Sequence, residues 1–84
     1  MTNSIEILRD EIHALSDSEL VAEARRLRNG APPLSPALAA TIDLLIARAE
    51  RDLKRRMRGS ESREDARGRL RTFCFNMRVN AARA

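Results

Sequence analysis

Apolar residues recur at steps of three and four positions in the first part of this chain, which is the spacing of one face of an α-helix. Two short stretches of this kind follow each other directly, and Ser16 and Glu19 between them have the spacing of a helix-capping box. The second stretch ends at Gly30, a residue type that commonly follows a helix. Residues 1–30 are therefore predicted to form an N-terminal helical hairpin or corner. Its apolar positions are Ile5, Leu8, Ile12, Leu15, Leu20, Ala24 and Leu27.

A longer apolar stripe follows a short proline-rich segment. Residues 31–35 include two consecutive prolines, which lack an amide donor and keep the backbone extended, so this segment is predicted to be a linker. Ser35 and Pro36 are residue types preferred at the N-cap and in the first turn of a helix. We expect residues 36–58 to form the longest helix of the chain. Its apolar face comprises Leu38, Ile42, Leu45, Ile46, Ala49, Leu53 and Met57.

The C-terminal part of the chain predicts one more helix, over residues 62–80. Gly68 lies inside this segment, and a glycine in a helix interior costs about 1 kcal/mol relative to alanine. The pattern therefore leaves open whether the helix begins before or after Gly68. The residues predicted on its inner face are Ala66, Leu70, Phe73, Cys74 and Met77.

These segments predict a single all-α domain over residues 1–84. We expect a small three- or four-helix bundle with a long third helix and up-down connectivity. The composition agrees with this prediction. A β-sandwich needs more aromatic residues in its strands and more glycines in its tight turns than this chain has, with 2% aromatic residues and three glycines. A chain of 84 residues buries a limited share of its surface. We therefore expect either a compact bundle that is stable alone or one that a partner stabilises.

Charge is distributed unevenly along the chain. Residues 1–47 carry four arginines and seven acidic residues, a net charge of −3. Residues 48–84 carry twelve basic and five acidic residues, a net charge of +7. Such an asymmetry either attracts an anionic partner or joins the two halves to each other, within one chain or between two copies.

Few residues of this chain are suited to catalysis or to metal binding. It contains one histidine, His13, and one cysteine, Cys74, whereas a structural zinc site usually draws four ligands from such residues. The three glycines are isolated from one another, which excludes a glycine-rich phosphate loop. We therefore expect no enzymatic activity, no cofactor and no metal ion.

The same features indicate where the protein works. A lone cysteine suits a reducing compartment, and the first residues have no basic segment followed by an apolar one, so we predict a cytoplasmic location. The longest strongly apolar run, residues 44–47, is too short to span a bilayer. The basic C-terminal segment lacks tryptophan and has few bulky apolar residues, so we do not expect membrane binding.

One candidate contact surface is a row of arginines on the predicted third helix. These residues recur at steps of three and four, which places them on one side of the helix, roughly opposite its apolar face. Such a row can follow a phosphate backbone, and it is also what the solvated face of a long amphipathic helix looks like. The residues are Arg48, Arg51, Arg55 and Arg58.

A second candidate surface is an additional apolar stripe on the C-terminal helix, opposite its inner face. Its small members would let another backbone approach closely, while its larger members would supply apolar area. A frayed C-terminal segment with one exposed phenylalanine would show the same pattern. The stripe consists of Gly68, Thr72, Phe75 and Val79.

Two functions follow from these surfaces. The leading hypothesis is a non-catalytic helical binding module that acts through protein–protein contacts as a regulator, adaptor or inhibitor. Such a module also self-associates if its stripe pairs with the stripe of a second copy of the chain. In that case Phe75→Asp should dissociate a complex or dimer and leave a folded monomer. The alternative is a regulatory protein that contacts nucleic-acid phosphates with its arginine-rich C-terminal half.

Overall fold

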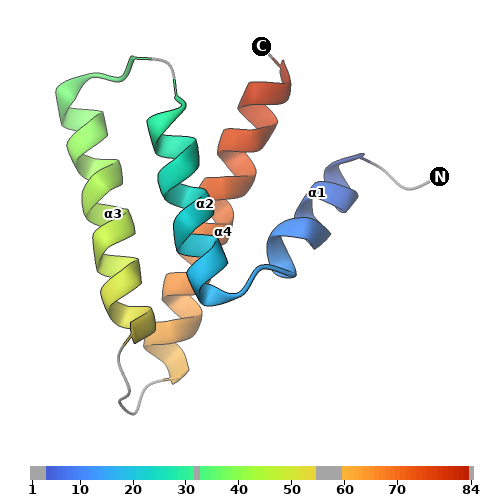
Figure 1. Ribbon diagram of the computed structural model, residues 1–84, viewed down its shortest axis with the longest axis vertical. Helices are drawn as coiled ribbons and strands as arrows, with labels where there is room; N and C mark the ends of the chain where they lie inside the picture. The colour runs from blue at the N-terminus through green and yellow to red at the C-terminus, as the bar shows by residue number, and fades with distance from the viewer. Residues whose placement is uncertain (1–3, 32, 55–59, 84) are drawn as a thin grey trace.

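A computed structural model describes residues 4–31, 33–54 and 60–83, and these form four α-helices in up-down order (Figure 1). No strand occurs in those ranges. The all-α bundle and its long third helix, predicted from the spacing of apolar residues, are confirmed. The helices are α1 (Ser4–His13), α2 (Asp17–Asn29), α3 (Pro36–Lys54) and α4 (Ser60–Arg83).

The fourth helix is longer than the sequence pattern indicates. It has 24 residues against 19 for α3, so the expectation that the third helix is the longest is wrong for the described residues. The predicted end of the third helix, residues 55–58, lies outside them. α4 begins at Ser60 and continues through Gly68, because Ala66 and Leu70 on either side are 2% and 0% exposed and their burial offsets the cost of the glycine.

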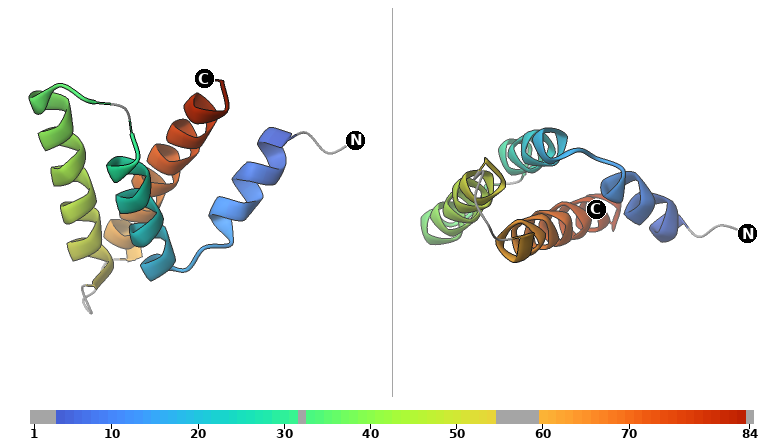
Figure 2. Two further views of the ribbon diagram at one scale, coloured as in Figure 1. Left: turned by 45° about the horizontal axis from the view of Figure 1, so that its top comes forward. Right: turned by 90° about the horizontal axis from the view of Figure 1, so that it is seen from below.

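The molecule is flat, with extents of 40 × 38 × 16 Å. α4 lies at its centre and packs against all three other helices, while α2 also packs against α3 (Figure 2). α1 and α3 lie at opposite ends (Figures 1 and 2). A layer this thin leaves one side of each outer helix without a neighbouring helix.

The core is built from the positions that the apolar spacing identifies. Each helix contributes to it, and among the described residues no polar or charged side chain is buried. The predicted inner face of α4 is confirmed at Ala66, Leu70 and Cys74, whereas Phe73 and Met77 are half-buried. The fully buried residues with the largest side chains are Ile12, Leu20, Ile46, Leu70 and Cys74.

The junction between α1 and α2 is a corner. The capping box is present: the Glu19 amide donates to Ser16 Oγ at 3.2 Å, and the Ser16 amide donates to Glu19 Oε1 at 2.9 Å. This arrangement fixes the start of α2. α1 then runs away from α2 and packs mainly against α4, so the two N-terminal helices meet α4 separately (Figure 1).

Ion pairs join the acidic and the basic parts of the chain. Arg78 on α4 reaches Glu23 on α2 at 2.9 Å and Glu11 on α1 at 3.4 Å. Arg25 on α2 pairs with Glu50 on α3 at 2.9 Å. Hydrogen bonds from Arg26 and then from Arg78 keep the pKa of Glu23 below its usual value. Part of the charge asymmetry seen in the sequence is therefore used inside the fold.

Candidate functional site

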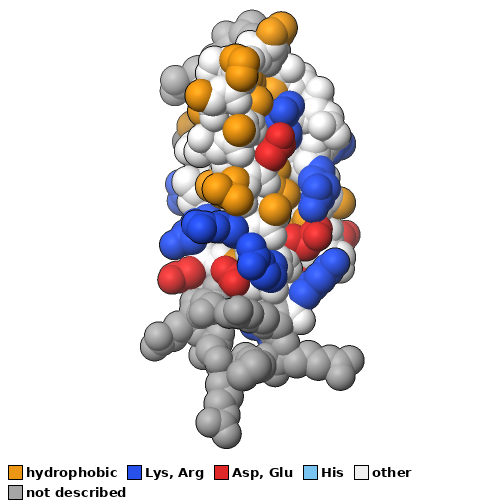
Figure 3. Space-filling model, turned by 90° about the vertical axis from the view of Figure 1, so that its left-hand side faces the viewer, with side chains coloured by type: hydrophobic (Ala, Val, Ile, Leu, Met, Phe, Trp, Pro, Cys, Tyr) orange, Lys and Arg blue, Asp and Glu red, His pale blue; other side chains and the backbone are white. Residues whose placement is uncertain are grey.

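The outer side of α3 exposes leucine side chains. Leu38 is 49% exposed and Leu44 is 54% exposed, although both lie on a helix that also contributes Ile46, Ala49 and Leu53 to the core. Figure 3 shows hydrophobic side chains gathered over the N-terminal part of this side, with charged side chains beyond them. A single exposed leucine is ordinary, whereas two exposed leucines on one helix add apolar area to its outer surface.

A groove runs beside these leucines, between α3 and α4. It consists of two hollows of about 640 and 280 Å³ that share Leu45 and Arg69. Leu45, Ala49 and Ala66 supply apolar lining, and Phe73 lines the larger hollow. We call this feature the α3–α4 groove. Its other lining residues are Thr41, Leu44, Arg48, Asp52, Glu64, Asp65, Gly68, Thr72 and Asn76.

Charges follow a definite order along the groove. Arg48 and Arg69 line the smaller hollow next to Leu44 and Leu45. In the part of the chain that the structure describes, neither arginine has an ion pair with a carboxylate. Farther toward the start of α4 the lining becomes acidic, with Asp52, Glu64 and Asp65. The groove therefore passes from apolar to basic to acidic.

The four residues of the predicted apolar stripe on α4 do not share one surface. Gly68 and Thr72 are exposed and line the α3–α4 groove. Phe75 is half-buried on the side of α4 where α1 packs, and Val79 is also half-buried. The side of α4 that the pattern leaves without a neighbour is covered in part by α1 of the same chain.

The aromatic residue beside the exposed part of the stripe is Phe73. The sequence pattern places Phe73 on the inner face, and the structure has it half-buried, packed against the core and open to the groove. Leu44 is a groove residue that the sequence pattern does not single out. Its signal is the adjacent pair Leu44 and Leu45, which widens the apolar face of α3 beyond what the core covers.

The arginine row on the third helix is described only in part. Arg48 and Arg51 are both exposed, and Arg48 lines the groove. Arg55 and Arg58 lie outside the described residues. The two described arginines thus present positive charge next to the exposed leucines.

The residues suited to chemistry are separated. Cys74 is fully buried in the core, and burial is the main reason why its pKa is raised to about 11. His13 is exposed at the end of α1. Among the described residues no group of three or more His, Cys, Asp and Glu side chains is placed to hold a metal ion. None of the helices in those ranges has the uninterrupted apolar length that a bilayer crossing needs.

Comparisons of this chain with models of protein families, with curated proteins and with solved structures find no match. The function is therefore inferred from the chemistry of the molecule itself. Gly68 and Thr72, which the sequence pattern marks as part of a candidate interface, line the larger hollow of the α3–α4 groove, of about 640 Å³.

Proposed function

We propose that this protein is a non-catalytic binding module whose α3–α4 groove holds an amphipathic helix of a protein partner. The observation that carries the proposal is the 54% exposure of Leu44 in the lining of the groove, with Leu38, 49% exposed, six residues nearer the start of the same helix. A protein that captures a helix in this way acts on its partner without chemistry, as a regulator, adaptor or inhibitor does.

Burial of apolar surface provides the driving force. Covering the exposed half of a leucine side chain contributes about 1 kcal/mol, so Leu38 and Leu44 together supply a useful part of a binding free energy. A helix presents apolar residues at steps of three and four along one side, which suits a groove formed by two neighbouring helices. The missing side chain at Gly68 lets the backbone of a partner helix approach α4.

The order of charges in the groove specifies the partner further. Arg48 and Arg69 favour carboxylates on the bound helix, and Asp52 and Asp65 favour a lysine or arginine farther along it. The partner helix is therefore apolar on one side, with acidic residues toward one end and basic residues toward the other. Such an arrangement fixes its direction in the groove more than it adds affinity.

Two labelled helical peptides of equal composition test this proposal. Both carry leucines at helical spacing, but one has glutamates in its N-terminal half and lysines in its C-terminal half, and the other has the reverse order. Fluorescence anisotropy should show saturable binding, with one peptide at least tenfold tighter than the other. Leu44→Asp should weaken that binding at least tenfold. Ile7→Asp on α1, where the native side chain is 46% exposed, should not.

Several results would contradict the proposal. Absence of saturable binding by either peptide, or equal losses for Leu44→Asp and Ile7→Asp, would show that the groove does not hold a helix. Sedimentation equilibrium of the unliganded chain provides a further check. A dimer that dissociates in Leu44→Asp would assign the groove to a second copy of this chain instead of another protein.

Nucleic-acid contact is the second candidate function. It is favoured by the exposure of Arg48 and Arg51, which have no ion-pair partner among the described residues. In that case affinity for duplex DNA or RNA should fall steeply with salt, and Arg48→Glu combined with Arg51→Glu should abolish it. Asp52 next to these arginines and the lack of an exposed aromatic side chain on α3 favour the protein partner.

A further inference from the structure

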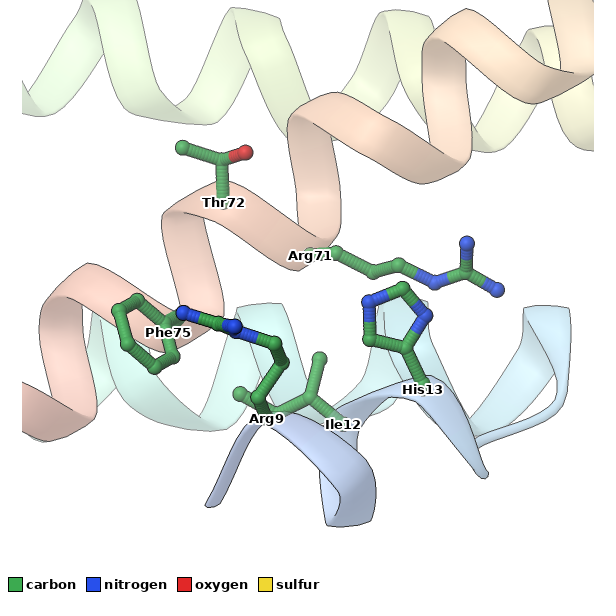
Figure 4. Close-up of a pocket in the computed structure, with 6 residues that line it drawn as sticks. All are labelled: Arg9, Ile12, His13, Arg71, Thr72 and Phe75. Atoms are coloured by element: carbon green, nitrogen blue, oxygen red, sulfur yellow. The ribbon is translucent and has the colours of Figure 1, made fainter. Parts of the chain in front are cut away.

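A second pocket lies between α1 and α4, and it shares one lining residue, Thr72, with the α3–α4 groove. Its volume is about 180 Å³, and a water molecule in the liquid occupies about 30 Å³, so there is room for a small solute. Figure 4 shows its lining side chains, three from each helix. They are Arg9, Ile12 and His13 from α1, and Arg71, Thr72 and Phe75 from α4.

The polar lining of this pocket is basic. Two guanidinium groups, those of Arg9 and Arg71, and the imidazole of His13 border it, and none of the carboxylates in the described part of the chain does. The guanidinium of Arg9 lies over the ring of Phe75, 5.7 Å from its centroid, which holds the cation at the edge of the cavity. The side chain of Arg71 extends beside His13 (Figure 4). Like charges gathered in this way repel one another unless an anion lies among them.

The arginines of α4 differ in their ion pairs, and Arg69, like Arg71, has none with the described residues. Arg67 and Arg78 each form ion pairs with carboxylates of other residues. Arg9 and Arg71 form none with the described residues, and Arg71 Nε is buried without a hydrogen-bond acceptor. The positive charge of Arg71 helps to lower the pKa of Asp17. Both oxygens of the Asp17 carboxylate, however, already accept hydrogen bonds from Arg67. The guanidinium groups of Arg9 and Arg71 therefore have charge available for an anionic ligand at the pocket that both line.

We propose that the α1–α4 pocket binds the phosphate group of a small molecule, held between the guanidinium groups of Arg9 and Arg71. Charge-assisted hydrogen bonds from guanidinium groups to phosphate oxygens are strong, and Arg9 and Arg71 each bring a guanidinium group to the lining of the pocket. The imidazole of His13 adds a further donor at the rim. This site goes beyond the proposed function, since neither arginine lines the α3–α4 groove.

The apolar part of the lining bears on the source of the phosphate. The half-buried ring of Phe75 is the apolar surface that this pocket offers, so a phosphomonoester with a flat organic group can make a contact that inorganic phosphate cannot. Free phosphate and a small phosphomonoester share the same anionic chemistry. The two are distinguished by comparing inorganic phosphate with phenyl phosphate.

Isothermal titration calorimetry at constant ionic strength, balanced with sodium chloride, tests the proposal. One equivalent of phosphate or phenyl phosphate should bind with saturable heat. Arg9→Gln and Arg71→Gln should each weaken binding at least tenfold, while Arg69→Gln, an exposed arginine of the same helix outside this pocket, should leave it unchanged. Tighter binding of phenyl phosphate would identify a phosphomonoester site, and equal or weaker binding would identify a free-phosphate site.

Two results would overturn the proposal. One is the absence of saturable heat with both probes. The other is a loss of binding in Arg69→Gln as large as in Arg9→Gln and Arg71→Gln, which would indicate general attraction of anions to a basic protein. Circular dichroism shows whether each variant is folded. If Arg71→Gln fails to fold, Arg9→Gln still tests the proposal, because Arg9 is on the surface of α1 and its replacement leaves the fold in place.

Discussion

Arg67 in α4 donates two hydrogen bonds to the carboxylate of Asp17, the first residue of α2. Nε lies 2.7 Å from Oδ1, and Nη2 lies 3.1 Å from Oδ2. This bidentate contact joins residues that are 50 positions apart in the chain and fixes the start of α2 against α4. The hydrogen bond from Arg67 is the main reason why the pKa of Asp17 lies below its usual 3.8.

Removal of this contact should have a pH-dependent effect. Because the pKa of Asp17 is lowered in the folded state, the carboxylate stabilises the fold above about pH 4, and that contribution is lost as the pH falls through the folded-state pKa. Asp17→Asn should therefore cost about 0.5–1 kcal/mol at pH 7, a value kept small by the partial exposure of both side chains. Urea unfolding at pH 7 and at pH 2.5 measures the difference.

The matched control is Arg69→Gln, which removes an exposed arginine without an ion pair in the described ranges. It should leave the unfolding free energy within about 0.5 kcal/mol of the original at both pH values. A cost for Asp17→Asn that is the same at pH 2.5 as at pH 7 would contradict the role given to the carboxylate.

Gly68 allows stability to be separated from binding. An added Cβ at this position would have no atom within 4 Å, and the residue lies inside α4. Gly68→Ala should therefore stabilise the protein by about 1 kcal/mol and raise its Tm by several degrees, because alanine is the better helix former. The same change should weaken binding of the helical peptide, because the new methyl group stands in the α3–α4 groove.

Thermal unfolding followed by circular dichroism and peptide anisotropy measure the two effects. Gly30→Ala is the control, because Gly30 follows α2 and its added Cβ would lie 3.4 Å from the carbonyl oxygen of Arg26. That variant should gain less stability and should bind the peptide normally. A Tm below that of the original protein for Gly68→Ala would show that the helix does not continue through this residue.

The local features of this fold could be predicted because short stretches of sequence determine them. Apolar residues at helical spacing identify Ile12, Leu20 and Leu70 as core positions, and the capping box at Ser16 and Glu19 identifies the start of α2. Neither inference requires knowledge of which helices are neighbours.

The candidate site was harder to predict because it depends on which helix packs where. Phe73 and Phe75 lie on different sides of α4, and their spacing alone does not say which side faces α3 and which faces α1. The stripe of Gly68, Thr72, Phe75 and Val79 is divided in the structure because α1 packs over part of it. The groove arises from two helices that are distant in sequence, so periodicity within one helix does not show it.

Cys74 should be unreactive in the folded protein. Its side chain has no exposed surface, and burial raises its pKa to about 11, so at pH 8 almost no thiolate is available and a reagent has no access. A colorimetric disulfide reagent at pH 8 should modify the thiol only as the protein unfolds. Modification of the native protein within minutes would show that α4 opens at this position.

The raised pKa of Cys74 also predicts the alkaline behaviour. Above pH 9 the thiol ionises in the unfolded chain but stays neutral in the folded one, so this residue makes the fold less stable as the pH rises from 9.0 toward about 11. Cys74→Ala should remove that dependence while costing about 1 kcal/mol at pH 7 through poorer packing. Urea titrations at pH 7 and pH 10 measure both quantities, and an equal slope in the two proteins would contradict the assignment.

Phe75→Asp separates contact within the chain from contact between chains. The pattern of apolar residues alone predicts a folded monomer for this variant, which would fail only to associate with another molecule. The structure changes that expectation, because Phe75 packs beside Ile12 and under the guanidinium of Arg9, both on α1. A carboxylate at this place removes apolar burial and the cation–π interaction, and its attraction to Arg9 and Arg71 offsets only part of that loss, so we expect a destabilisation of about 2 kcal/mol concentrated at α1.

Amide hydrogen exchange resolves where that destabilisation occurs. In Phe75→Asp the amides of α1 should exchange at least tenfold faster, while those of α2 and α3 change much less, since α1 packs mainly against α4. Phe73→Asp is the matched control, because Phe73 is also half-buried but lines the groove beside α3. It should weaken peptide binding and leave the protection of α1 in place. Unchanged exchange of α1 in Phe75→Asp would mean that α1 is not held by this side chain, and the apolar stripe of α4 would again be available to a partner.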